Sequence, residues 1–177
     1  MAMVILVTGG SRSGKSAFAQ DLAESLPGKR FFLATCPHTD AEMSARIRRH
    51  QADRQAGVWQ TIEEPLRLAE VLGRCPAGSV VLLDCLTLWI SNLLHAGDRE
   101  EQMLGEDQVE EECRRLLAAA DQLHTLVMVT NEVGSGIVPE NALARRYRDL
   151  VGRCNQCMGR AADQVHLVVC GVPLRIR

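Results

Sequence analysis

The chain has 177 residues, of which 46% are hydrophobic, 24% charged and 3% aromatic, and its formal net charge is -2. This length and composition are ordinary for a soluble enzyme that buries a full core without disulfides or metals, so we expect a single domain over residues 1–177. The small net charge gives no reason to expect a nucleic-acid surface, and the scarcity of aromatic rings argues against base stacking.

The first predicted strand leads directly into a glycine-rich loop. The apolar run at residues 4–8 is followed by Gly9-Gly10-Ser11-Arg12-Ser13-Gly14-Lys15-Ser16, which has the spacing G-x-x-x-x-G-K-S. The glycines let successive amide N–H groups turn toward a polyphosphate at the start of the following helix, predicted over residues 16–26. In such a loop Lys15 reaches the β- and γ-phosphates and the Ser16 hydroxyl holds Mg²⁺. The sequence therefore predicts a nucleotide site.

A helix carrying a histidine is predicted next. A capping box at residues 39–42 begins it, and Met43, Ile47, His50 and Arg54 share one of its faces. Neighbouring arginines favour the neutral imidazole of His50, whose free nitrogen is a nucleophile, so nucleotidyl transfer through a covalent phosphoramidate is permitted. A lone histidine on a basic helix is more often solvated, and the spacing alone leaves both interpretations open.

The remaining elements alternate between strands and helices. The apolar, β-branched-rich runs that we interpret as strands cover residues 3–8, 30–35, 79–84, 125–130 and 165–170. Helical periodicity fills the gaps, most clearly over residues 106–123, and residues 97–105 are expected to form a loop. Gly171-Val172-Pro173 followed by alternating residues predicts a short hairpin at the edge of the sheet. Continuous apolar strands separated by helices indicate an α/β fold with a mostly parallel sheet covered on both faces.

The predicted strand over residues 79–84 ends in a carboxylate. Asp84 supplies the acidic group that a Mg²⁺-nucleotide needs opposite Ser16, although an ordinary turn at the end of a strand also explains it. The segment after Asp84 lacks the D-x-x-G pattern of switch GTPases, and residues 130–133 lack their N-K-x-D pattern. A regulatory GTPase is therefore unexpected.

The seven cysteines are an odd number and are scattered along the chain. They are expected to be reduced thiols of a cytosolic protein. Cys154 and Cys157 have redox or zinc spacing but lie within a predicted helix without a second ligand pair, so we interpret them as packing residues. No stretch reaches membrane-spanning length, and the first apolar run is too short for a signal peptide, so we expect a cytoplasmic protein.

Motifs along nearly the whole chain match one known family. They comprise residues 5–16, Arg46-Ile47-x-x-His50-x-x-x-Arg54, Trp59-x-Thr61-x-Glu63, residues 129–141, Arg145, Arg148-Asp149, Gly152-Arg153, Asn155-Gln156, Ala162-Asp163 and Gly171-Val172-Pro173. Together they resemble the bifunctional adenosylcobinamide kinase/adenosylcobinamide-phosphate guanylyltransferases of cobalamin biosynthesis. Several of these blocks are long and unusual, so the match is more specific than the phosphate loop alone.

The resemblance implies a three-layer P-loop NTPase fold of the RecA-like type, a homotrimer and two reactions. The first phosphorylates the hydroxyl of the aminopropanol arm of adenosylcobinamide from ATP or GTP. The second carries GMP from GTP on a histidine to that phosphate, giving adenosylcobinamide-GDP and pyrophosphate. The alternatives are a P-loop kinase of another small alcohol, with no covalent intermediate, and a nucleotide-binding regulatory module.

The resemblance also implies a set of site residues. His50 and Lys15 are expected to be catalytic, Gly9 through Ser16 to wrap the phosphates, and Ser16 to bind Mg²⁺. The other residues expected to bind nucleotide are Thr35, Cys36, Pro37, Gln51, Ala52, Asp53, Arg54, Glu63 and Asp84. A carboxylate such as Glu63 accepts hydrogen bonds from guanine N1–H and N2–H₂, which adenine does not offer, so a guanine preference has a mechanism. Residues 131–134 form either a turn at the end of the sheet or part of the corrinoid pocket.

Overall fold

The computed structural model describes residues 1–36, 58–99 and 103–177. Its strands are β1 Met3–Gly9, β2 Arg30–Ala34, β3 Trp59–Glu63, β4 Val80–Asp84, β5 Thr125–Val129, β6 Gln164–Val169 and β7 Val172–Arg175. Its helices are α1 Lys15–Ser25, α3 Leu68–Arg74, α4 Leu86–Arg99, α5 Glu106–Ala119, α6 Ala142–Ala161 and the 3-10 helix η1 Val133–Ser135. The helix predicted around His50 lies outside the described residues.

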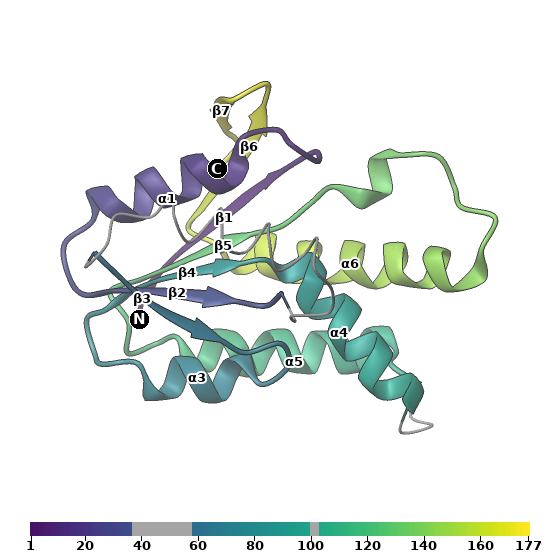
Figure 1. Cartoon of the computed structure of the whole chain (residues 1–177), viewed down its shortest axis with the longest axis horizontal. Helices are drawn as coiled ribbons and strands as arrows, with labels where there is room; N and C mark the ends of the chain where they lie inside the picture. Colours follow the sequence, from purple (N-terminus) through teal and green to yellow (C-terminus); the bar gives the residue numbers. More distant parts are fainter. Residues whose placement is uncertain (37–57, 100–102) are drawn as a thin grey trace.

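The strands form one 7-stranded sheet in the order β3-β2-β4-β5-β1-β6-β7 (Figure 1). The pairs from β3 to β6 are parallel, and β6 and β7 are antiparallel. The predicted parallel sheet with a C-terminal edge hairpin is therefore confirmed. Strand β3 is not predicted by a continuous apolar run, because three of the five residues of this edge strand are exposed.

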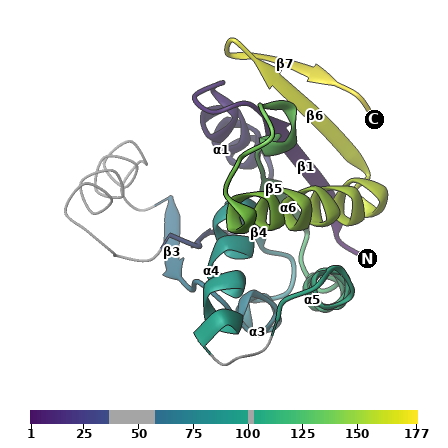
Figure 2. The same cartoon turned by 90° about the vertical axis from the view of Figure 1, so that its right-hand side faces the viewer.

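Helices cover both faces of the sheet (Figures 1 and 2). Successive strand residues point to opposite faces, so Ile5 packs into the cluster under α1 while Leu6 packs into the cluster under α3, α4, α5 and α6. The predicted three-layer α/β architecture is confirmed. The inner strands β1, β4 and β5 are largely apolar and buried because both of their faces are covered.

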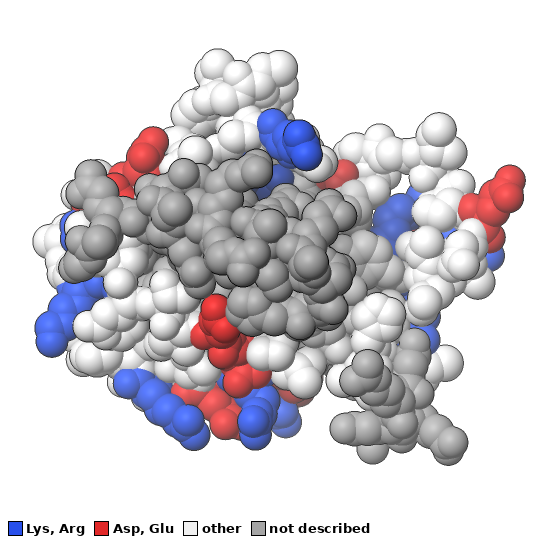
Figure 3. All heavy atoms as spheres, viewed as in Figure 1, with Lys and Arg blue, Asp and Glu red and all other residues white. Residues whose placement is uncertain are grey.

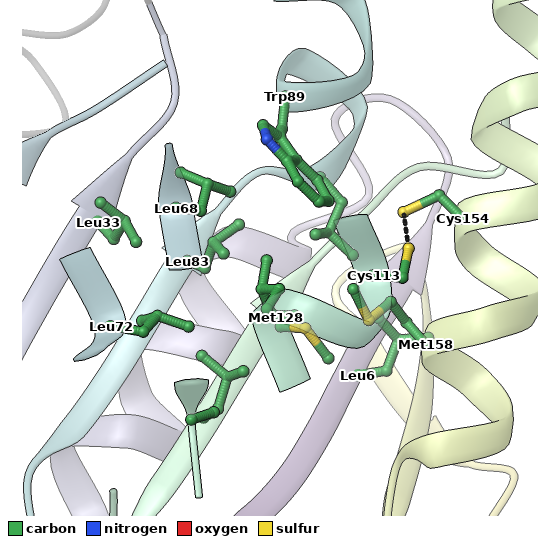
Figure 4. Packing of buried hydrophobic residues seen from close by; sticks show 14 of the residues in the cluster. Leu6, Leu33, Leu68, Leu72, Leu83, Trp89, Cys113, Met128, Cys154 and Met158 are labelled. Atoms are coloured by element: carbon green, nitrogen blue, oxygen red, sulfur yellow. Dashed lines mark hydrogen bonds between the residues drawn. The ribbon is translucent and has the colours of Figure 1, made fainter. Parts of the chain in front are cut away.

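The larger core lies between the sheet and helices α3, α4, α5 and α6 (Figure 4). Trp89 of α4 is 1% exposed, and its indole Nε1 donates a hydrogen bond to the Leu66 carbonyl oxygen. The Cys113 thiol of α5 donates to Sγ of Cys154 of α6 across this core, at 3.7 Å. Cys154 and Cys157 thus lie on one helix as packing residues, in line with the sequence interpretation, and all seven cysteines are free.

Two boundaries differ from the sequence prediction. Helix α5 begins at Glu106 as expected but ends at Ala119 rather than at residue 123, and Leu123 closes the following turn through its N–H to the Ala120 carbonyl oxygen, at 2.9 Å. Helix α4 extends to Arg99, so the first residues of the predicted loop at 97–105 are helical.

The described surface carries both signs of charge. In Figure 3 the basic and acidic side chains alternate around the visible face and neither sign forms a continuous area. Among the described residues, no helix is long and apolar enough to cross a membrane.

Candidate nucleotide site

The loop between β1 and α1 has the backbone that a phosphate cradle requires. Gly9 has a φ of 155° and Gly14 a φ of 94°, a region that side chains disfavour, and a Cβ on Gly9 would lie 2.5 Å from the Val168 carbonyl oxygen. Helix α1 begins at Lys15, directly after Gly14. The N-terminus of α1 therefore follows directly on this loop, an arrangement that favours a polyphosphate.

Lys15 lies over the loop rather than in solvent. Its side chain is buried, and its ammonium donates a hydrogen bond to the Gly10 carbonyl oxygen at 3.0 Å. Ser16 is the next residue of α1 and is half-buried. Both predicted phosphate and metal ligands therefore lie at the N-terminus of the helix.

The turn of the C-terminal hairpin supports the same loop. The Gly171 N–H donates to the Ser13 carbonyl oxygen at 2.8 Å, and a Cβ on Gly14 would lie 3.1 Å from the Gly171 Cα. The sequence predicts the hairpin, whereas this contact is found only in the structure. The paired glycines at Gly14 and Gly171 are the signal, since two backbones approach closely only where side chains are small.

The acidic residues of the predicted site lie along one edge of the sheet. Glu63 of β3 pairs with Ala34 of β2, Ala34 pairs with Asp84 of β4, and Asp84 pairs with Val129 of β5. Because neighbouring strands are about 4.8 Å apart, Asp84 and Glu63 are separated by about 10 Å along this edge. The P-loop strand β1 pairs with β5 on the other side, so all these groups end at the carboxyl edge, where α/β sheets bind ligands.

Thr35 is a structural residue at this edge. Its hydroxyl is fully buried, accepts from the Cys85 N–H and donates to the Cys85 carbonyl oxygen, both at 2.8 Å. Its own carbonyl oxygen accepts from the Asn92 amide of α4, at 2.8 Å. Thr35 thus fixes the end of β2 against the end of β4, which places Asp84 and the half-buried Cys36.

The thiol of Cys85 lies close to the charged groups of the site. Burial, followed by the negative charge of Asp84, raises its pKa to about 11, while the Lys15 charge acts in the opposite direction. The charges of Asp84 on β4 and Lys15 on α1 therefore both influence the pKa of the buried Cys85 thiol. This thiol stays protonated at neutral pH and supplies no nucleophile.

A carboxylate that the sequence analysis did not assign to the nucleotide site joins it from the segment after β5. The buried Thr8 hydroxyl donates to Glu132 Oε1 at 2.5 Å, and the Glu132 N–H donates to the Gly9 carbonyl oxygen at 3.3 Å. The signal in the sequence is the position of Glu132, three residues after a strand that neighbours β1.

Among the described residues, three buried polar atoms lack a hydrogen-bond partner, and one of them lies in this loop. Within the described ranges they are Ser13 Oγ, Asn131 Oδ1 and Arg153 Nε. Such orphaned atoms are uncommon in native proteins and are expected where a ligand supplies the partner. A cavity of about 510 Å³ is lined by Gly134 from the segment after β5 and by Arg148 and Arg153 of α6.

The structure thus brings together the predicted residues that it describes. Gly9, Gly10, Ser11, Arg12, Ser13, Gly14, Lys15 and Ser16 form the loop, and Thr35, Cys36, Glu63 and Asp84 lie along the carboxyl edge of the sheet. Pro37, His50, Gln51, Ala52, Asp53 and Arg54 lie outside the described residues. The described residues contain no group of three histidine, cysteine or acidic side chains arranged as a metal site. Ser16 and Asp84 offer oxygen donors of the kind that binds Mg²⁺ together with phosphate oxygens.

These features define a P-loop nucleotide-binding protein: a strand that leads into a glycine-rich loop, a lysine at the start of the next helix, and a mostly parallel sheet. In agreement, the fold is similar to a solved chain described as a prototypical ATPase from the type III secretion system of pathogenic bacteria, with a TM-score of 0.62 and 12% identity over 93% of this chain and 50% of that one. At that identity the likeness shows the fold alone.

The family follows from the sequence comparisons. The model of the family described as cobinamide kinase / cobinamide phosphate guanyltransferase matches residues 5–176, and this chain belongs to that family. The protein is 42% identical to the bifunctional adenosylcobalamin biosynthesis protein CobU of Salmonella typhimurium, over 99% of this chain and 100% of that protein. It is 40% identical to CobU of Escherichia coli, with the same coverage, and 39% identical to CobP of Pseudomonas aeruginosa, over 97% of this chain and 96% of CobP.

Proposed function

We propose that this protein phosphorylates adenosylcobinamide with ATP or GTP and then converts the product to adenosylcobinamide-GDP with GTP, as one domain in the cytoplasm. The family supports both reactions. The observation that carries the proposal is the phosphate loop with its buried Lys15, held against β1, β5 and the C-terminal hairpin.

In the kinase step, the substrate hydroxyl attacks the γ-phosphorus and the nucleoside diphosphate leaves. Lys15 and the loop N–H groups hold the phosphate oxygens as negative charge develops on them. Ser16 and Asp84 would hold Mg²⁺, which when bound neutralises charge on the β- and γ-phosphate oxygens. The main task of the protein is to position the two substrates, because the chemistry itself needs little covalent help.

In the guanylyl transfer step, a neutral imidazole nitrogen of His50 attacks the α-phosphorus of GTP and pyrophosphate leaves. The phosphate of the first product then attacks the same phosphorus, which forms the new diphosphate bond and frees His50. The basic residues around His50 in the sequence favour the neutral imidazole before attack and provide charge for the phosphate oxygens.

Glu63 is proposed to select guanine. It is exposed at the end of β3, on the same edge as Asp84, so a base that reaches beyond the phosphates along this edge meets it. In Glu63→Gln, one carboxylate oxygen that accepts from guanine is replaced by an amide that donates. We expect the ratio of GTP to ATP in forming the covalent enzyme to fall; a ratio equal to that of the unaltered protein would remove Glu63 from this role.

A homotrimer is part of the proposal. The last strand forms one edge of the sheet, and Val172 and Leu174 on it, with Ile176 directly after it, are between 61% and 67% exposed. A row of exposed apolar side chains on an edge strand is the kind of surface that another subunit covers. This supports an interface at the hairpin.

Labelled nucleotides test the proposed activity. Incubation with GTP labelled at the α-phosphate is expected to give protein-bound GMP that is labile in acid and stable in base, present in His95→Ala and absent in His50→Ala. His95 is an exposed residue of α4 and serves as the matched control. Phosphorylation of adenosylcobinamide without any covalent label would indicate a single-activity kinase. Nucleotide binding without either reaction would indicate a regulatory module.

A further inference from the structure

The segment after β5 places a carboxylate beside the phosphate loop. The Thr130 N–H donates to the Val7 carbonyl oxygen at 2.9 Å, and the Glu132 N–H donates to the Gly9 carbonyl oxygen at 3.3 Å. The chain therefore continues alongside β1 beyond the regular sheet and reaches the first glycine of the loop. Glu132 lies level with the start of the phosphate cradle.

Two further contacts fix this position. The amide of Asn155 on α6 donates to the Asn131 carbonyl oxygen at 3.0 Å and accepts from the Thr130 hydroxyl at 2.6 Å. The buried hydroxyl of Thr8 donates to Glu132 Oε1 at 2.5 Å. Thr8 of β1 thus orients the carboxylate, and Asn155 of α6 fixes the backbone that precedes it. Glu132 as a whole remains exposed to solvent.

A cavity that could hold the phosphoryl acceptor lies close to Glu132 in the chain. The cavity of about 510 Å³ begins two residues further on, at Gly134, and continues along α6 past Arg148, Gly152 and Gln156. The cavity therefore adjoins the segment that carries Glu132, so an acceptor arm that extends from it toward the phosphate loop passes along this segment. Asp84 lies on β4, on the opposite side of β5, where a carboxylate is suited to the metal.

We propose that Glu132 binds the hydroxyl of the phosphoryl acceptor and takes its proton in the kinase step. The hydroxyl oxygen forms the new bond to the γ-phosphorus, the bond from that phosphorus to the bridging oxygen breaks, and the nucleoside diphosphate leaves. The proton passes to the Glu132 carboxylate and from there to solvent, to which the residue is exposed. This inference rests on the proposed function and adds a residue that acts in one of its two reactions.

The conservative variant Glu132→Gln tests the role. Its amide oxygen still accepts from Thr8, so the loop contact is kept while the base is lost. We expect the turnover of adenosylcobinamide phosphorylation to fall about 100-fold or more, the lower range for loss of a general base. Formation of GMP-enzyme from GTP labelled at the α-phosphate, in the absence of acceptor, is expected to stay at the rate of the unaltered protein, because His50 is the nucleophile there.

Two further variants separate chemistry from support of the loop. Thr8→Val removes the contact but keeps the carboxylate, so we expect a smaller loss of kinase turnover than in Glu132→Gln. Glu140→Gln changes an exposed carboxylate of the same connection and is expected to behave as the unaltered protein.

The outcomes are distinct. Kinase turnover of Glu132→Gln equal to that of the unaltered protein would overturn the inference. Equal loss of phosphorylation and GMP-enzyme formation would also overturn it, because Glu132 would then only support the loop. If the unaltered protein fails to phosphorylate adenosylcobinamide, the proposed function itself fails and the inference fails with it.

Discussion

The two faces of the sheet are built from different kinds of side chain. The face under α3, α4, α5 and α6 is filled by large residues such as Trp89 and Met128. On the other face, α1 is the described helix that packs on the strands, and its fully buried residues are Ala19 and Ala23. The face under α3, α4, α5 and α6, which we call the thick face, carries a core of large apolar side chains. On the opposite face α1 packs closely against the strands through small side chains.

This difference separates stability from chemistry. Small residues on α1 let it pack closely on the strands, and its N-terminus follows the carboxyl end of β1 through the phosphate loop. The large core on the opposite face buries the apolar area that stabilises the fold. We therefore expect mutations on the thick face to lower stability and mutations around α1 to lower activity.

The largest expected effect is on the thick face. Trp89→Ala removes a fully buried indole together with its hydrogen bond to the Leu66 carbonyl oxygen. Substitutions of this kind cost about 3–5 kcal/mol, a large part of the stability of a domain of this size. Denaturant unfolding measures the loss. Phe18→Ala on α1 is the matched aromatic control and should cost less, because Phe18 is only partly buried; equal losses would contradict the division between the faces.

Lys15→Ala tests the other half of the comparison. Removal of the ammonium takes a positive charge from the phosphate oxygens of the transition state, so we expect both the kinase step and GMP-enzyme formation to fall about 100- to 1000-fold. The midpoint of unfolding should change much less than in Trp89→Ala. Lys29→Ala, at an exposed lysine before β2, is the control and should retain both activities. Retained activity in Lys15→Ala would remove the loop from the mechanism.

The sequence predicted the parts of the molecule that depend on local signals. The P-loop glycines, the continuous apolar strands and the hairpin turn each carry their own pattern, and the structure confirms these three predictions. The contact between Thr8 and Glu132 joins residues 124 positions apart. It depends on the order of the strands in the sheet, which neither segment's local sequence predicts. Strand β3 escapes prediction for a related reason, since this edge strand lacks the continuous apolar pattern of a buried strand.

The contact between the hairpin and the loop gives the smallest expected effect and refines the division between the faces. Gly171 has a φ of 80°, and its N–H donates to the Ser13 carbonyl oxygen. In Gly171→Ala the methyl group meets no atom but disfavours this backbone conformation, at a cost of about 1 kcal/mol. If the hairpin supports the loop, nucleotide affinity should fall together with stability, as titration and thermal unfolding would show. Gly73→Ala in α3, where a methyl group also meets open space, should leave affinity unchanged. Weaker stability with unchanged affinity in Gly171→Ala would mean that the hairpin stabilises the sheet edge alone, and that the phosphate loop is held by β1, β5 and α1.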